Sequence, residues 1–296
     1  MAEKKMLFIY NPHAGKEGIR SRLLDIIDIF TKADYEVTVH PTQKQGDGID
    51  ATLKKAHKYD ILACCGGDGT LDEVVTGMMM REYKIPIGYV PAGTTNDFAK
   101  SLGIPSNMIK AAENIVAGKT YACDIGSFND DTFVYIAAFG IFTDVSYETN
   151  QNIKNVLGHL AYVLEGAKRI NSYPSYHMKI TANHKVVEED FLFGMVSNSR
   201  SAGGFKNITG KNVDLADGVF EVTLIKKPQN VIELNKIMTS LVSGNVDSEC
   251  MYCFKTEQIK FESSEKVAWT LDGEYGGAHK KVMIKNENKA LEIIVP

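Results

Sequence analysis

The chain has 296 residues, which is enough for two domains of roughly 150 residues each. Its hydrophobic content of 44% and charged content of 24% are typical of a globular protein with a full core. The net charge of −4 argues against a protein that binds nucleic acid or anionic membranes through overall positive charge. The N-terminus shows no signal-peptide pattern, and the longest apolar run, 133–142, is half of the roughly 20 residues that a membrane-spanning helix needs. We therefore expect a cytoplasmic protein without a transmembrane segment.

Short apolar runs alternate with segments of helical spacing through the first third of the chain. The apolar runs cover 6–10, 35–40, 61–65 and 87–90, and a helical pattern follows each of them. This alternation is typical of a doubly wound parallel sheet with helices on both faces. Because ligands gather at the carboxyl ends of such strands, the loops that follow the strands should meet at one edge. We expect this α/β domain to span residues 1–125.

The loop after the third strand is rich in glycine and reads Gly66-Gly67-Asp68-Gly69-Thr70. Three glycines in four positions remove the Cβ atoms that would hold a ligand away from the backbone. Backbone N–H groups and the positive end of a helix dipole are then left facing one small volume. That volume suits a phosphate, although a tight turn alone explains a lone glycine pair about equally well.

Two further loops at the same predicted edge carry glycine. The first strand is followed by Asn11, Pro12 and Gly15, where the asparagine can bond to the turn or to a nucleotide. The loop after the fourth strand contains polar side chains that can cap the next helix or face a ligand, namely Thr94, Asn96 and Asp97 beside Gly93. Capping explains one or two of these residues but not the recurrence of such clusters in three loops.

The pattern changes after residue 121, where strand-like runs with polar turns dominate. Runs of strands with few helices favour an antiparallel sandwich or barrel. We expect this second domain to span 126–296, with a cleft between it and the first domain. One segment of helical spacing, 153–169, interrupts the strands, and it is either an amphipathic helix packed on its own sheet or an apolar wall for a lipid.

Two Asp-Gly sequences in the second half carry further candidate chemistry. Such dipeptides are good hairpin turns, and this explains part of both. A carboxylate of Asp272 or Glu274, placed opposite a phosphate loop, can accept the proton of a hydroxyl that attacks a γ-phosphoryl group. Asp214 and Asp217 offer hard oxygen ligands for Mg²⁺ or Ca²⁺, but two carboxylates alone do not define such a site.

Taken together, these motifs resemble the soluble bacterial diacylglycerol kinase and lipid kinase family, whose catalytic domain is shared with eukaryotic diacylglycerol and sphingosine kinases. The resemblance covers nearly the whole chain and rests on five stretches, 11–15, 66–70, 91–98, 124–126 and 271–274. The glycine loop by itself is also shared with NAD kinases.

The resemblance implies an N-terminal ATP-binding α/β domain and a C-terminal β-sandwich that carries the catalytic acid and a lipid-binding face. It assigns the catalytic base to the pair Asp272 and Glu274, with Glu274 the usual nominee. It places ATP contacts at Asn11, Pro12, Gly15, Thr42, Gly66, Gly67, Asp68, Gly69, Thr70, Glu73, Gly93, Thr94, Asn96 and Asp97.

The resemblance also implies Mg²⁺ in two settings. One is a structural ion held by Asp214, Asp217 and the backbone carbonyl of Val219. The other is a magnesium-linked carboxylate network that includes Asp68, Asp97 and Asp124.

The expected function is an ATP-dependent kinase that phosphorylates a lipid hydroxyl at the inner membrane face, with diacylglycerol converted to phosphatidic acid. The sequence leaves open which lipid is used, and a homodimer is one of the open oligomeric states. Two alternatives are a soluble kinase of the NAD kinase type and a non-catalytic protein that binds lipid or nucleotide. No nucleic-acid partner is expected.

Overall fold

The structure is a computed structural model that describes residues 4–14, 18–93, 96–140, 174–199, 201–202, 205–206, 213–243 and 249–296. The chain divides into two compact units, Met1–Ile125 with Asn288–Pro296, and Gly126–Glu287. Strands β5 (Lys119–Phe128) and β15 (Glu274–Val295) run from one unit into the other. Residues 288–296 thus join the first unit, whereas the sequence placed them in the second domain. Within the described residues, no helix is both long and apolar enough to cross a membrane.

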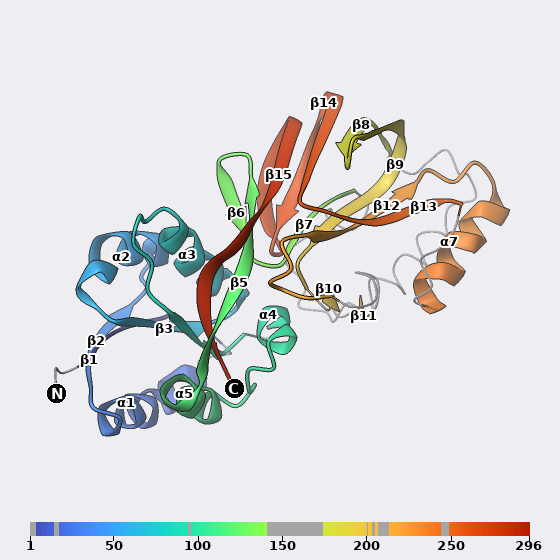
Figure 1. Ribbon diagram of the computed structural model, residues 1–296. Helices are drawn as coiled ribbons and strands as arrows, with labels where there is room; N and C mark the ends of the chain where they lie inside the picture. The colour runs from blue at the N-terminus through green and yellow to red at the C-terminus, as the bar shows by residue number, and fades with distance from the viewer. Residues whose placement is uncertain are drawn as a thin grey trace. The chain divides into compact units, whose positions relative to one another are not determined.

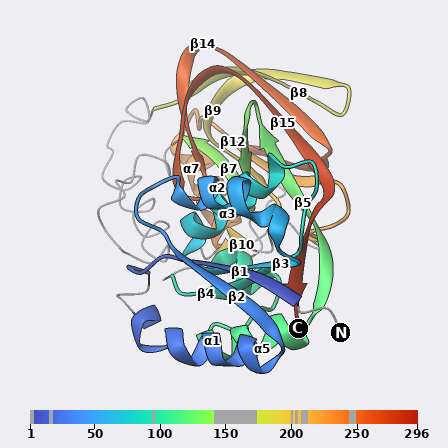
Figure 2. The same ribbon diagram turned by 90° about the vertical axis from the view of Figure 1, so that its left-hand side faces the viewer.

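The first unit is a parallel sheet between two layers of helices (Figures 1 and 2). Its strand order is β15-β4-β3-β1-β2, with the strand bounds β1 (Lys4–Tyr10), β2 (Tyr35–Pro41), β3 (Ile61–Gly66) and β4 (Ile87–Pro91). Helices α1 (Leu23–Lys32) and α5 (Met108–Ala117) lie on one face, and α2 (Asp47–Lys55) and α3 (Asp68–Met79) lie on the other. The short helix α4 (Asp97–Ser101) follows β4, and 3-10 turns occupy Gly18–Ser21 and Ala56–Lys58.

The sequence explains these elements locally. Every residue of β3 is buried, as expected for a central parallel strand that helices cover on both faces. Helix α5 begins at a side-chain cap, because Oδ1 of Asn107 accepts hydrogen bonds from the N–H groups of Ile109 and Lys110, both at 3.1 Å. The last strand returns to this sheet through a parallel pair between Ile293 and Ile87.

The second unit consists mainly of antiparallel strands (Figure 1). Its main strand order is β13-β12-β9-β7-β14-β15, with β8 paired to both β14 and β9, and β5 paired to β6 and β15. The strand bounds are β6 (Asp131–Phe133), β7 (Ile136–Gly140), β8 (Tyr176–Ala182), β9 (Lys185–Ser197), β12 (Phe220–Lys226), β13 (Met251–Thr256) and β14 (Gln258–Leu271). A separate two-stranded ladder joins β10 (Ser201–Ala202) to β11 (Phe205–Lys206), and helix α7 (Val231–Ser243) follows β12.

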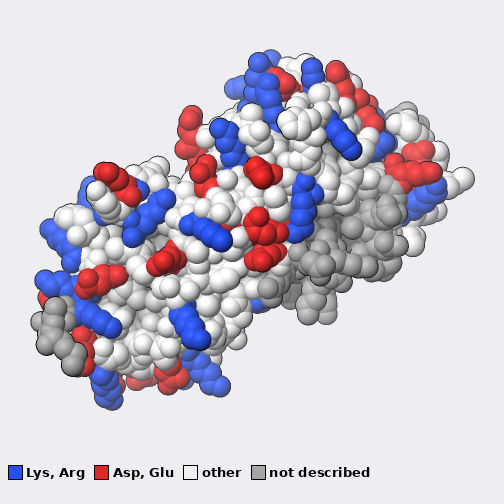
Figure 3. Space-filling view, in the orientation of Figure 1, with Lys and Arg blue, Asp and Glu red and all other residues white. Residues whose placement is uncertain are grey.

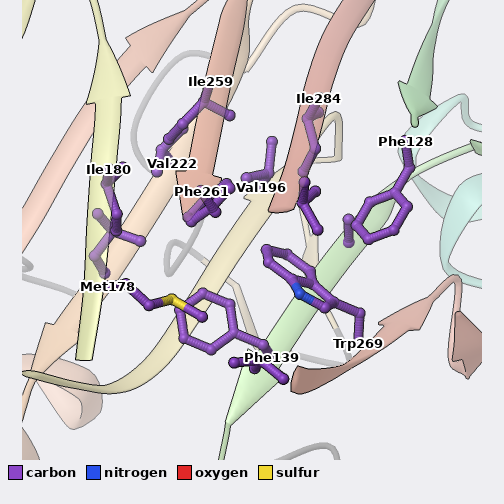
Figure 4. Close-up of a cluster of buried hydrophobic side chains, with 14 of the residues drawn as sticks. Phe128, Phe139, Met178, Ile180, Val196, Val222, Ile259, Phe261, Trp269 and Ile284 are labelled. Atoms are coloured by element: carbon purple, nitrogen blue, oxygen red, sulfur yellow. The ribbon is translucent and has the colours of Figure 1, made fainter. Parts of the chain in front are cut away.

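An aromatic cluster forms the core of the second unit (Figure 4). Trp269 is almost fully buried, and its ring centroid lies 4.8 Å from that of Phe139, 5.0 Å from that of Phe261 and 5.1 Å from that of Phe128. These tilted and edge-on pairs are the arrangement that aromatic quadrupoles favour. Gly194 makes room for the cluster, since a Cβ there would lie 2.1 Å from the ring of Phe139. Because side chains alternate along each strand, one side of these strands carries the buried core residues.

Charged side chains of both signs are interspersed over the face of the molecule seen in Figure 3. This distribution is in keeping with the net charge of −4. Among the described residues on that face, the two signs are mixed and no large patch of one sign stands out.

Candidate active site

Two glycine loops touch at the carboxyl ends of β3 and β4. Gly66 pairs with Pro91 in the sheet, and the N–H of Ala92 donates to the carbonyl of Gly66 at 2.7 Å. Beyond this pair the two backbones meet directly, because a Cβ on Gly93 would lie 2.7 Å from the Cα of Gly67. No side chain fits between them. Helix α3 begins here with Gly67 as its N-cap residue, so the positive end of its dipole lies at this edge.

Asn96 ties the second of these loops to the first. Its Oδ1 accepts the N–H of Gly93 at 3.1 Å, and its Nδ2 donates to the carbonyl of Gly93 at 2.8 Å. Its own N–H donates to Oδ2 of Asp68 at 3.0 Å. The backbone of Asn96 is left-handed, with φ of 48°, which asparagine tolerates better than most residues. The Asn96 side chain therefore braces the loop, where the sequence suggested a contact with ATP.

Asp68 and Asp97 form the acidic part of this edge. In the part of the chain that the structure describes, Oδ1 of Asp68 is buried and has no hydrogen-bond partner. Burial, and then the charge of Asp97, raise the pKa of Asp68 to about 6. Asp97 is also buried, and its Oδ1 lies 3.5 Å from Nζ of Lys100. A buried carboxylate oxygen that faces a second carboxylate is suited to receive a cation.

The loop after β1 lies at the same edge. The N–H of Asn11 donates to the carbonyl of Cys65 at 2.9 Å, which joins the ends of β1 and β3. Oδ1 of Asn11 accepts the N–H of His13 at 2.9 Å in a local turn. Thr42, after β2, donates its N–H to Tyr10 at 2.9 Å, and its side chain is half-buried. Pro12 is also half-buried, whereas the predicted contacts at Gly15 and Thr94 lie outside the described residues.

Glu73 was expected to contact ATP, but its carboxylate bonds to another part of the protein. Oε1 accepts the N–H of Gly46 at 2.7 Å, and Oε2 accepts the N–H of Gly48 at 2.8 Å. Gly46 has a φ of 82° and is the N-cap residue of α2. The Glu73 carboxylate therefore closes the N-terminus of α2 and fixes the loop that leads to it.

Asp272 lies at a two-residue hairpin turn between β14 and β15. Leu271 pairs with Glu274, and the φ angles of Asp272 and Gly273 are 51° and 90°, as in a type I′ turn. Its carboxylate is engaged by backbone amides of the β6–β7 segment. Oδ1 accepts the N–H groups of Tyr135 and Ile136, both at 2.9 Å, and Oδ2 accepts the N–H of Val134. A carboxylate whose oxygens accept three backbone amides is held in place by contacts that a proton acceptor would have to give up.

Glu274 follows this turn directly and is exposed. Of the two acids in the predicted pair, Glu274 alone therefore has the accessibility that a general base needs. Asp272 and Glu274 belong to the second unit, whereas Asp68 and Asp97 belong to the first.

The carboxylates of Asp214 and Asp217, where the resemblance implies a structural Mg²⁺, are partly engaged by the protein itself. Oδ1 of Asp214 accepts the N–H of Ala216 at 3.1 Å, and Oδ1 of Asp217 accepts the N–H of Val219 at 3.2 Å. The second oxygen of Asp217 lies 3.0 Å from the ammonium of Lys255. Among the described residues, no three or more His, Cys, Asp or Glu side chains are grouped as a metal site. The structural Mg²⁺ implied at Asp214, Asp217 and Val219 therefore stays a prediction.

Lys255 also reaches a second acid, Oε1 of Glu221, at 3.0 Å. Burial raises the pKa of Glu221 to about 7 even with this partner. The ammonium thus cross-links the turn at Asp217 to β12. Sequence reasoning missed Lys255, because it lies 38 residues from Asp217 and stands in an ordinary strand pattern.

Asp124, expected in the carboxylate network, has a structural contact. It is fully buried, and its Oδ1 accepts the N–H of Lys289 at 2.7 Å and Nδ2 of Asn288 at 3.1 Å. Lys289 has a φ of 50°, so the carboxylate supports a strained point where β15 enters the first unit. The helical segment predicted at 153–169 lies outside the described residues.

The comparisons with known proteins agree with this arrangement. The diacylglycerol kinase catalytic domain family matches residues 5–128, and the YegS C-terminal NAD kinase beta sandwich-like domain family matches residues 136–295. The diacylglycerol kinase of Bacillus subtilis strain 168 is 34% identical over 277 residues, which cover 93% of this chain and 91% of that protein. The diacylglycerol kinase of Staphylococcus carnosus strain TM300 is 33% identical over 276 residues, which cover 93% and 90%.

A solved structure of a candidate diacylglycerol kinase from Bacillus anthracis strain Sterne superposes with a TM-score of 0.82 at 25% identity, covering 99% of this chain and 95% of that one. The predicted fold class, an α/β domain followed by a β-sandwich, is confirmed. The predicted resemblance and the prediction of an ATP-dependent lipid kinase are also confirmed. The chain belongs to the diacylglycerol kinase family.

Proposed function

We propose that this enzyme transfers the γ-phosphoryl group of ATP to the free hydroxyl of diacylglycerol and releases phosphatidic acid and ADP. The names of its relatives support diacylglycerol as the substrate. One observation carries the phosphoryl chemistry. At the edge where Gly67 and Gly93 meet backbone to backbone, Asp68 keeps a buried carboxylate oxygen without a partner in the described chain.

The ATP phosphates bind, in this proposal, to the backbone of the loops after β3 and β4. Gly67 and Gly93 allow close approach, and the first-turn amides of α3 add the positive end of its dipole. Asn11, Pro12 and Thr42 border the nucleotide at the neighbouring strand ends. Gly15 and Thr94 are assigned to the same site from the family resemblance alone.

Mg²⁺ is proposed to enter this edge together with ATP. Oδ1 of Asp68 and the carboxylate of Asp97 would hold it, because both groups are buried and their two negative charges repel each other until a cation lies between them. When bound, Mg²⁺ offsets the negative charge of the phosphates and of these carboxylates. Glu73 and Asn96 act one step away by holding the loops that carry these groups.

Glu274 is proposed to take the proton of the lipid hydroxyl. As the hydroxyl oxygen forms its bond to the γ-phosphorus, its proton passes to the Glu274 carboxylate, and the bond between the γ-phosphorus and the bridging oxygen breaks to release ADP. Asp272 keeps the hairpin that carries Glu274 in place through its three amide contacts.

We also infer that the enzyme works as a peripheral protein at the inner membrane face. Its proposed lipid substrate lies in the bilayer and its co-substrate ATP is in the cytoplasm, so the two meet only at that surface. The net charge of −4 favours a local contact over a general electrostatic attraction to anionic lipids.

A labelled-phosphate assay tests the proposal. The purified protein is incubated with γ-labelled ATP, Mg²⁺ and vesicles that contain dioleoylglycerol, and in parallel with NAD or with a total lipid extract. We expect label in phosphatidic acid and none in a phosphorylated NAD. Label in another lipid of the extract but not in phosphatidic acid would replace the proposed substrate. ATP binding without any transfer would favour the non-catalytic alternative.

Gly93→Ala should lower kcat/KM for ATP by about 10²-fold. The new methyl group would lie 2.7 Å from the Cα of Gly67 and 2.8 Å from Oδ1 of Asn96, so the two loops must separate. A displacement of about 1 Å at a catalytic site costs on the order of 10²-fold in rate. The measurement is steady-state kinetics with ATP varied at saturating lipid.

Gly103→Ala is the matched control for this substitution. Gly103 has a φ of 71°, and a Cβ there meets nothing within 4 Å, so the change introduces backbone strain without pushing loops apart. Equal losses of activity in the two variants would mean that general destabilisation, and not loop separation, causes the effect.

A further inference from the structure

A buried tyrosine side chain lies within hydrogen-bond distance of both glycine loops. Tyr89 lies on β4, opposite Cys64 of β3, and is fully buried. Its neighbour Gly88 faces α5, since a Cβ there would lie 2.7 Å from Ile115. Because side chains alternate along a strand, Tyr89 extends from the other face of the sheet, on which α2 and α3 lie.

The hydroxyl of Tyr89 reaches both loops. It lies 3.1 Å from the carbonyl of Gly66 and 3.3 Å from Oδ1 of Asn96, within donating distance of each. Burial, and then the nearby Asp68, raise the pKa of Tyr89 well above its ordinary value, so the phenol stays a neutral donor at working pH.

The two acceptors do not depend on this hydroxyl for a partner. The N–H of Ala92 already donates to Gly66, and the N–H of Gly93 already donates to Asn96. The Tyr89 hydroxyl is therefore not required to satisfy a buried acceptor. What it adds is a fixed separation between the end of β3 and the Asn96 side chain.

Asn96 passes this constraint on to Asp68. Its side chain accepts from Tyr89 and its backbone N–H donates to Oδ2 of Asp68. We infer that Tyr89 is a positioning residue for phosphoryl transfer, holding Asn96 and through it the Asp68 carboxylate in register with the glycine loop. The inference rests on the proposed function and adds to it a residue outside the family motifs.

Tyr89→Phe tests this role, because it removes one oxygen and leaves the buried ring in its place. We expect kcat to fall about tenfold while KM for ATP changes by less than about twofold. The backbone amides that bind the phosphates remain, and only the alignment for transfer is lost. The matched control is Tyr252→Phe, which removes a phenolic oxygen that donates to Oε1 of Glu189 at 2.7 Å in the second unit.

Three results would overturn the inference while the proposed function stands. They are a wild-type kcat in Tyr89→Phe, an equal loss in Tyr252→Phe, and a change confined to KM. The wild-type enzyme in the same assay separates the two claims, since a wild type that phosphorylates no lipid overturns the proposed function itself. Thermal unfolding must show that both variants are folded at the assay temperature, so that a loss of activity cannot be caused by unfolding.

Discussion

Asp68→Asn should lower kcat by about 10²- to 10³-fold and at the same time make the protein more stable. The activity falls because the neutral amide no longer offers a charged oxygen for the cation that accompanies ATP, and single electrostatic groups of this kind contribute on the order of 10²–10³ in rate. The substitution keeps an oxygen that accepts the N–H of Asn96. The loop itself should therefore stay in place.

The gain in stability follows from the pKa of Asp68, which burial and the charge of Asp97 raise from 3.8 to about 6. The folded protein prefers the protonated acid, so this group's favourable contribution is complete below pH 3.8 and is lost as the pH rises through 6. At neutral pH the charge of Asp68 then costs the folded state up to about 3 kcal/mol. An asparagine avoids this cost, so the Tm of Asp68→Asn should exceed that of the wild type at pH 7.5 and match it below pH 4.

Two measurements check this prediction, thermal unfolding across pH without nucleotide and kcat/KM for ATP across the same range. The wild-type kcat/KM should fall below about pH 6, where free Asp68 becomes protonated. Asp60→Asn is the control, because Oδ2 of Asp60 also accepts a backbone N–H, that of Lys5 at 2.7 Å, but at an exposed position. An active Asp68→Asn, or one that unfolds earlier than the wild type at pH 7.5, would contradict the prediction.

Much of this edge could be predicted from the sequence because it depends on local pattern. Apolar runs followed by helical spacing indicate β-α units, and in such units the loops after successive strands meet at one edge. Asn11 and the loops of Gly67 and Gly93 are indeed brought together there. Glycine at these points is a local signal, because only a residue without Cβ allows the backbones to touch.

The contacts that decide the roles of individual acids are long-range, and the sequence carries no signal for them. Glu73 reads as one more polar residue after a glycine loop, yet its oxygens bond to residues 27 and 25 positions away. The parallel pair between Ile293 and Ile87 joins opposite ends of the chain, so no periodicity could place 288–296 in the first unit. Lys255 and Tyr89 were overlooked for the same reason, since each looks like an ordinary strand residue until its partner is known.

Asp272 and Glu274 differ only through such long-range contacts, and substitution should separate them. Glu274→Gln is expected to lower kcat by about 10²- to 10⁴-fold, the usual range for a lost general base, with KM for ATP and thermal stability unchanged. The glutamine has the same shape and the position is exposed, so folding should not respond. Asp272→Asn should instead destabilise the protein by about 1–3 kcal/mol, because one amide N–H of the new side chain would replace an oxygen that now accepts a backbone donor.

The two variants together identify the general base, because the base's variant should lose kcat while staying folded, whereas the other variant should keep kcat. If Glu274 takes the proton, Glu274→Gln is folded and nearly inactive, while the folded fraction of Asp272→Asn at low temperature keeps a kcat well above that of Glu274→Gln. If Asp272 takes the proton, its asparagine variant loses kcat even when fully folded, and Glu274→Gln works at the wild-type rate. Because three backbone amides from the β6–β7 segment already hold the Asp272 carboxylate, moving a proton onto it would break contacts that fix the hairpin. Glu274 is exposed, so we expect the hydroxyl's proton to pass to Glu274 and not to Asp272.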